Sequence, residues 1–110
     1  MDRISVPNRR TSELHSFMHN GIMFQGQVSW IEGDQPDQWR PVEMFLEGGK
    51  NGTAIQAVAR DTAVAASLAL QFGTPIDTLR HALTRNDDGT PAGPLGALLD
   101  LISGGAPSRG

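Results

Sequence analysis

Apolar and polar positions alternate with a period of two early in the chain. From Ile22 to Trp30, apolar side chains fill every second position except Gly26, and polar side chains fill most positions between them. This pattern is typical of a strand with one buried face. Asn20-Gly21 comes directly before it, and both residues tolerate the positive φ of a type I′ turn. We therefore predict a β-hairpin around this turn.

A two-residue turn also fixes the register of the hairpin. It sets Phe17 beside Phe24 and His15 beside Gly26. The opposite face of the sheet then carries the apolar residues Leu14, Met18 and Met23. A sheet that is apolar on both faces needs a cover on each, so we expect helices on one face and a partner chain on the other.

A third strand is predicted from Pro41 to Glu47, after a polar connection rich in turn formers. Its core face carries Val42, Met44 and Leu46. Consecutive strands usually pair with one another, which gives a three-stranded antiparallel meander.

The pattern changes at Thr53, from which a long helix is predicted to reach Phe72. This segment has seven alanines and neither Gly nor Pro, as a long helix requires. Thr53 is the expected N-cap and Gly73 the expected stop. One face holds the polar residues Gln56, Arg60, Ser67 and Gln71. Apolar residues spread over the other faces, so we expect a helix buried on most sides, against the sheet or against a second copy.

Two shorter helices complete the predicted α+β fold. The first opens with Thr74 as N-cap, Pro75 at N1 and Asp77 at N3. The second covers about Leu95 to Ile102 and follows a turn-rich stretch. The predicted organisation is a flexible arm over 1–12, a single domain over 13–102 and a flexible tail over 103–110.

Composition excludes several classes of function. The 110 residues suffice for one small domain, and nine basic against twelve acidic residues give a net charge of −3, which argues against nucleic acid as the main partner. The absence of cysteine excludes disulfides, thiolate nucleophiles and cysteine-based metal sites. The sequence shows neither a membrane span nor a signal peptide, so we expect a cytoplasmic protein.

Gly48 to Thr53 connects the third strand to the long helix, and it is either a tight turn or a cradle for phosphate. A P-loop requires G-x-x-x-x-G-K-[ST], but Met44 stands at its first glycine and Asn51 follows Lys50. In the phosphate interpretation, Lys50 and the amides of the loop hold the anion. The candidate ligand-binding residues are Gly49, Lys50, Asn51, Gly52, Thr53, Arg60 and Trp39.

Arg60 and Trp39 are candidates for different reasons. A buried arginine needs an anionic partner, which is either a carboxylate of Asp61 or Glu43 or a bound phosphate. Trp39 lies outside the core row and is free to stack on a base. The three histidines are too scattered for a shared metal ion, and no catalytic set can be assembled, so we expect neither a metal, a cofactor nor an enzyme.

The chain from Arg40 to Ile102 resembles the C-terminal TSCPD-type region of adenosylcobalamin-dependent (class II) ribonucleotide reductases. Glu43-Met-Phe-Leu46 matches a strand motif of that family, and Gly49-Lys50-x-Gly52 matches its loop. The helix ending S-L-x-L-Q-x-G-x-P is matched from Ser67 to Pro75. Val6-Pro-Asn-Arg-Arg10 resembles the segment that precedes this region in the reductases.

The resemblance implies a small α+β module that stands alone and does not itself reduce ribonucleotides, because the cysteines of the family are absent. We expect a non-catalytic nucleotide-binding or regulatory module that forms homo-oligomers, with a reductase as a possible partner. Two alternatives stay open: a phage-style protein that sequesters a signalling cyclic nucleotide, and a protein–protein adaptor without a small ligand.

Overall fold

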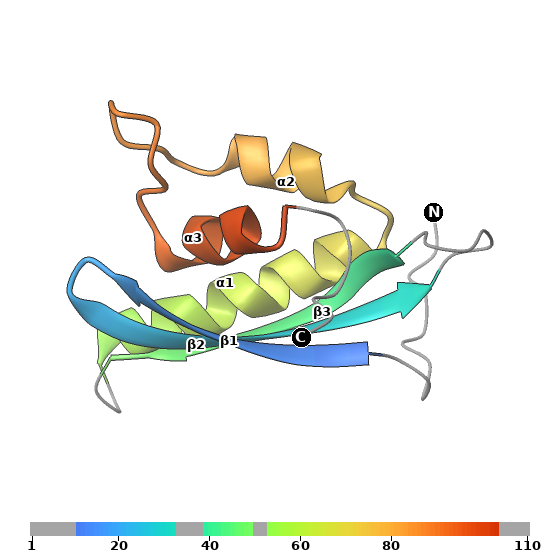
Figure 1. Cartoon of the computed structure of the whole chain (residues 1–110), viewed down its shortest axis with the longest axis horizontal. Coiled ribbons are helices and arrows are strands. Elements are labelled where there is room, and N and C mark those ends of the chain that lie inside the picture. The colour runs from blue at the N-terminus through green and yellow to red at the C-terminus, as the bar shows by residue number, and fades with distance from the viewer. Residues whose placement is uncertain (1–10, 33–38, 50–52, 104–110) are drawn as a thin grey trace.

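The computed structural model describes residues 11–32, 39–49 and 53–103. Its strands are β1 (Thr11–His19), β2 (Ile22–Glu32) and β3 (Trp39–Gly48), and its helices are α1 (Ala54–Gln71), α2 (Ile76–Ala82) and α3 (Pro94–Leu101). The strands form one antiparallel sheet in the order β1-β2-β3, so the predicted α+β meander is confirmed (Figure 1). β1 begins two residues before the predicted start of the domain. Residues 1–10 of the predicted arm and 104–110 of the predicted tail lie outside the described residues.

The turn between β1 and β2 has the conformation that Asn20-Gly21 predicts. Asn20 has a φ of 50° and Gly21 a φ of 78°, and left-handed values at both central positions define a type I′ turn. Phe17 lies opposite Phe24 and His15 lies opposite Gly26, so the predicted register is confirmed. The rings of Phe17 and Phe24 stack with their centroids 5.9 Å apart.

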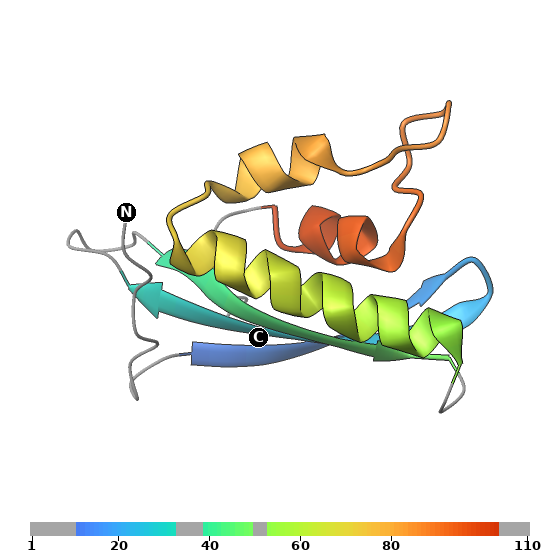
Figure 2. The same ribbon diagram turned by 180° about the vertical axis from the view of Figure 1, so that it is seen from behind.

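Helices α2 and α3 lie over one face of the sheet, which we call the inner face, and α1 runs along the β3 edge and packs against the same core (Figures 1 and 2). The buried strand residues of the core are Phe24, Val28, Trp30, Val42, Met44 and Leu46, which include the three predicted for β3. From α3, Leu95, Leu98 and Leu99 complete this layer. Each such side chain contributes about 1.5–3 kcal/mol to folding when it leaves water.

Two glycines of the strands let side chains approach the backbone closely. A Cβ on Gly26 would lie 2.7 Å from Cδ1 of Leu98, so the leucine of α3 fills the gap that this glycine leaves in the buried row. A Cβ on Gly48 would overlap the ring of Phe24, which is its cross-strand partner. These contacts bring α3 and the aromatic ring directly onto the sheet.

Helix α1 is attached to the backbone of β3 by two buried polar side chains. The Met44 amide donates to Oγ of Ser67 over 2.8 Å, and the Ser67 hydroxyl lies 3.1 Å from the Met44 carbonyl. Nε2 of Gln71 donates to the Val42 carbonyl over 2.9 Å. These backbone groups point away from β2, at the edge of the sheet. The helix therefore takes the place that a fourth strand would occupy.

This arrangement corrects two predictions about the long helix. Ser67 and Gln71 were placed on a polar face with Gln56 and Arg60, but they are 8% and 2% exposed. The expectation that the sheet buries most sides of the helix is also wrong, because apolar residues remain exposed at Ile55, Val58, Val64, Leu68 and Phe72. The reason is that only the side of α1 that faces β3 and α3 is covered, and the open strand edge selects hydrogen-bonding side chains there. Burial of these exposed apolar residues against a second copy stays a prediction.

The ends of the helices agree with the sequence in part. Oγ1 of Thr53 accepts a hydrogen bond from the Gln56 amide, so the predicted N-cap of α1 is confirmed. Gly73 follows α1 with a φ of 102°, as a C′ glycine does. The predicted start of α2 is wrong, because Pro75 rather than Thr74 is the N-cap and makes no side-chain capping bond. The ψ of 143° at Pro75 keeps it outside the helix.

A carboxylate between two guanidinium groups joins α2 and α3. Asp100 of α3 accepts from Nε of Arg80 over 2.8 Å and from Nη2 of Arg85 over 2.7 Å. Arg85 makes a second bond to Asp100 and one to the Gly89 carbonyl, which anchors the turn between the helices. The hydrogen bond from Arg85, followed by that from Arg80, lowers the pKa of Asp100 to about 2 against the opposing effect of desolvation.

We expect Ser67→Ala to destabilise the fold, because it leaves the buried Met44 amide without its acceptor. The free energy of unfolding should fall by about 1–3 kcal/mol, which denaturant titration measures. The matched control is Thr62→Ala, whose hydroxyl bonds only within α1, to the Ala59 carbonyl; it should change stability by less than about 0.5 kcal/mol. Equal losses in the two variants would contradict the role given to Ser67.

Asp100 should make folding stability depend on pH at the acid end. Its pKa is lower in the folded state, so the stabilisation is present above the ordinary pKa of 3.8 and is lost as the pH falls toward about 2. The side chain is 31% exposed, so solvent screening limits the contribution to about 1 kcal/mol. The stability difference between wild type and Asp100→Asn, measured by thermal unfolding, should shrink from pH 5 to pH 2. A difference that does not change with pH would contradict this.

Candidate functional site

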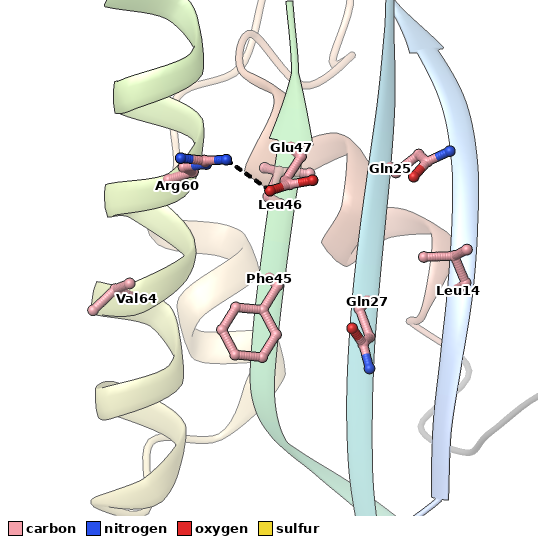
Figure 3. A pocket seen from close by; sticks show the side chains of 8 residues that line it. All are labelled: Leu14, Gln25, Gln27, Phe45, Leu46, Glu47, Arg60 and Val64. Carbon is pink, nitrogen blue, oxygen red and sulfur yellow. Dashed lines mark hydrogen bonds and ion pairs between the residues drawn. The ribbon is translucent and has the colours of Figure 1, made fainter. Parts of the chain in front are cut away.

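A hollow of about 470 Å³ lies where α1 borders the outer face of the sheet, the face that the helices do not cover. Because α1 runs along the edge of β3, one flank of the helix stands beside that outer face. The lining residues are Leu14, Gln25, Gln27, Phe45, Leu46, Glu47, Arg60 and Val64 (Figure 3). We call this hollow the outer pocket.

The register of the sheet assembles the floor of the outer pocket. Leu14, Gln27 and Phe45 are successive cross-strand partners, so one row across the sheet carries a leucine, an amide and an aromatic ring. The next row pairs Gln25 with Glu47. Alternate residues of a strand point to one face, so the same alternation that buries Met44 and Leu46 presents Phe45 and Glu47 to the pocket.

Arg60 forms the wall of the outer pocket together with Val64, one turn further along α1. Its Nη2 donates to Oε1 of Glu47 over 2.8 Å (Figure 3). The two side chains are 55% and 61% exposed, and ion pairs this accessible contribute about 0–1 kcal/mol to stability. The bond can therefore exchange for another anion at small cost to the fold.

The partner of Arg60 differs from the carboxylates that the sequence suggested. Asp61 is adjacent on the helix, and neighbours in sequence do not face one another there. Glu43 lies four residues from Glu47 along β3, which is about 13 Å in an extended strand. The sequence analysis did not identify Glu47 as the partner of Arg60. Which residue of β3 lies beside Arg60 depends on how α1 is positioned along β3, and no local sequence pattern predicts that position.

A second, smaller hollow of about 250 Å³ lies toward the start of α1. It shares Gln25 and Glu47 with the outer pocket, and its other lining residues are Met23, Gly48, Gly49 and Gln56. The two hollows therefore follow β3 toward its carboxyl end. Gly49 has a φ of 77°, which lets the chain leave the strand there.

The structure brings some of the predicted ligand residues together and separates others. Gly49, Thr53 and Arg60 lie at the same end of the sheet as the hollows, with the Thr53 side chain engaged in capping α1. Lys50, Asn51 and Gly52 lie outside the described residues. Trp39 is partly packed against the core. It is the first residue of β3, so nine residues of strand, about 30 Å, separate it from Gly48.

The outer pocket contains the aromatic side chain of Phe45, whereas the sequence had predicted Trp39 as the residue that stacks on a base. It is 50% exposed and its ring lies in the pocket beside Gln27 (Figure 3). Neither Phe45 nor the two glutamines were candidates from the sequence. The signal that identifies them is their place in the alternation, opposite to the buried residues of β2 and β3.

Within residues 11–32, 39–49 and 53–103, no three His, Asp or Glu side chains are placed to hold a metal ion. The histidines make separate contacts. Nε2 of His15 lies 3.2 Å from Oε1 of Glu13, and Nε2 of His19 lies 3.1 Å from the Ala92 carbonyl. Among the described helices, none has the length and apolar character needed to cross a membrane.

Comparison with known proteins gives one distant relative. Over 94 residues, 86% of this chain, the sequence is 29% identical to a vitamin B12-dependent ribonucleotide reductase of Bradyrhizobium diazoefficiens. The match spans only 7% of the length of that enzyme. Neither a family model nor a solved structure matches the chain. The similarity supports a relationship to ribonucleotide reductases and leaves the TSCPD-type assignment as a prediction.

Proposed function

We propose that the chain is a non-catalytic nucleotide-binding module, and the outer pocket is the observation that carries the proposal. Small-molecule sites commonly have volumes of about 300–1,000 Å³ and combine apolar walls with a few polar groups. The outer pocket has a volume of about 470 Å³ and combines an aromatic ring, two primary amides and an arginine. These are the groups that stack on a base, bond its edge and pair with a phosphate.

In this proposal the base stacks on Phe45. Stacking on an aromatic side chain accepts any base, since every base has a π face. Gln25 and Gln27 follow one another on the outer face of β2, and each amide offers both donors and an acceptor to the edge of a base. From Phe45 to Gly48, the last residue of β3, is three residues of strand, about 10 Å. The phosphates then extend toward the loop before α1.

A phosphate can pair with Arg60 only if it displaces the carboxylate of Glu47. The described lining of the outer pocket carries one cation and one anion, Arg60 and Glu47, so it has no net charge. A phosphate must therefore replace Glu47 as the partner of Arg60, and Glu47 acts as a competitor within the chain. Lys50, which the sequence places in the same loop, would add the second positive charge.

The similarity to a B12-dependent reductase favours a role next to such an enzyme as a regulatory module. The alternative role, sequestering a signalling cyclic nucleotide, uses the same pocket without an enzyme partner. Isothermal titration of the purified chain with nucleoside triphosphates and with cyclic di- and trinucleotides separates the two ligand classes. Loss of binding in Lys50→Ala would support the phosphate loop, and a variant indistinguishable from wild type would remove Lys50 from the site.

A different use of the same face is favoured by its apolar residues. Leu14, Met18, Met23 and Phe45 are all at least half exposed on the outer face, and contiguous exposed apolar side chains commonly mark a protein-interaction site. An adaptor that docks a protein there is therefore the second candidate. It predicts co-elution with a target protein and no heat on titration with nucleotides.

We expect opposite effects from the two charged residues of the outer pocket. Arg60→Ala should weaken nucleotide affinity by roughly tenfold or more, since it removes a charge-assisted hydrogen bond. Glu47→Gln should strengthen affinity by a few fold, because the competitor of the phosphate is lost. Isothermal titration measures both.

The matched control for these variants is Arg40→Ala. Arg40 is exposed on the same strand but lies seven residues from Glu47, about 23 Å, beyond the screening length at physiological salt. Its replacement should leave affinity nearly unchanged. Weaker binding in both Arg60→Ala and Glu47→Gln would show that the ion pair supports the fold rather than competing with a ligand.

Phe45→Ala should weaken nucleotide binding by about 1–3 kcal/mol, the usual loss when a base loses its stacking partner. Phe72→Ala is the control, because Phe72 is exposed to nearly the same extent, 47% against 50%. It lies twelve residues, about 18 Å, along α1 from Arg60. Titration should show normal affinity in Phe72→Ala, and equal losses in the two variants would remove Phe45 from the proposed site.

A further inference from the structure

The two edges of the sheet differ in whether their backbone groups have hydrogen-bond partners. At the β3 edge, Ser67 and Gln71 of α1 bond the backbone of Met44 and Val42. At the other edge lies β1, and within the described residues no strand is paired to its far side. An edge strand presents a row of N–H and C=O groups that can pair with another chain.

The geometry of the hairpin tells which groups of β1 face outward. In a hairpin with a two-residue turn, the flanking pair, here His19 and Ile22, exchanges both hydrogen bonds. Bonded pairs then alternate along the ladder. The odd-numbered residues of β1 therefore bond β2, and the outward backbone groups belong to Ser12, Leu14, Ser16 and Met18.

β1 lacks three of the usual devices against pairing at an edge, although Glu13 places a charged side chain on its inner face. Proteins commonly block such edges with proline, lysine or a β-bulge. The nine residues Thr11–His19 contain no proline, lysine or arginine, and their pairing with β2 shows no register shift. The bulge of this sheet lies between β2 and β3, at Ser29 and Trp30.

We propose that β1 pairs antiparallel with β1 of a second copy of this chain. A two-fold axis through the pair would join two sheets into a continuous six-stranded sheet. Residues opposite one another in such a pair lie on the same face. With the axis at Leu14, Glu13 of each copy faces His15 of the other, and the two Leu14 side chains meet on the outer face.

The side chains of Glu13 and His15 favour a second copy of this chain as the partner of β1. Pairing about Leu14 sets a carboxylate opposite an imidazole twice, whereas pairing about Glu13 would set two carboxylates opposite each other. Within one chain, Nε2 of His15 lies 3.2 Å from the Glu13 carboxylate but makes no well-aligned hydrogen bond. In the paired strands, Glu13 of the second copy, whose carboxylate also accepts a hydrogen bond from Trp30 of its own chain, lies beside the His15 ring. This inference does not depend on nucleotide binding.

The absence of cysteine from the chain makes a direct test possible. In Leu14→Cys, two thiols would face each other across the axis with Cα atoms about 5.5 Å apart, which suits a disulfide. Leu14 is 64% exposed, so the substitution spares the core. Ala57→Cys, on an exposed position of α1, is the matched control for random collision.

We expect the wild type to sediment with twice the mass of the 11.8 kDa chain, and Leu14→Cys to form dimers at least roughly tenfold faster than Ala57→Cys. Leu14→Lys and Leu14→Glu should each sediment as monomers, and their mixture should restore the dimer. Circular dichroism checks that each variant folds. A monomeric wild type up to millimolar concentration would overturn the proposal, as would a dimer in which Leu14→Cys cross-links no faster than the control.

Discussion

The hydrogen bonds between Ser67, Gln71 and the backbone of β3 determine the rest of this structure. A three-stranded sheet has two open edges, and buried backbone groups at an edge need partners. Two short polar side chains on α1 supply them, which fixes the helix beside β3 as well as above the core. The flank of α1 that carries Arg60 then stands next to the outer face. Without this attachment the outer pocket would have a floor and no wall.

The alternation of side chains along each strand produces both the core and the outer pocket. Each strand sends one set of residues to the helices and the other set to the outer face, so Met44 and Leu46 are buried while Phe45 and Glu47 are presented. A site of this kind is built on strands, whose positions are held by the ladder, rather than on loops. Its polar groups remain accessible to water, and the Arg60–Glu47 bond can rearrange at little cost to folding.

Local patterns predicted the elements of the fold well. The Asn20-Gly21 turn, the register of the hairpin, the core face of β3 and the cap at Thr53 each follow from a few adjacent residues, and the structure confirms them. The errors concern alignment between distant segments. Helical periodicity grouped Ser67 with Arg60, but could not reveal that one would meet a strand edge and the other a carboxylate. Trp39 is close to the loop in sequence, yet an extended strand carries it to the far end of the sheet.

The glycines at positions 26 and 48 have a consequence for how this sequence can change over time. Leu98 and the Phe24 ring occupy the space that any larger residue would need there, so descendants of this chain should retain both glycines. The outer face has no such constraint, because its side chains project into solvent. Lineages that differ in what they bind are therefore expected to diverge at residues such as Gln25, Gln27 and Phe45, over an interior that stays nearly invariant.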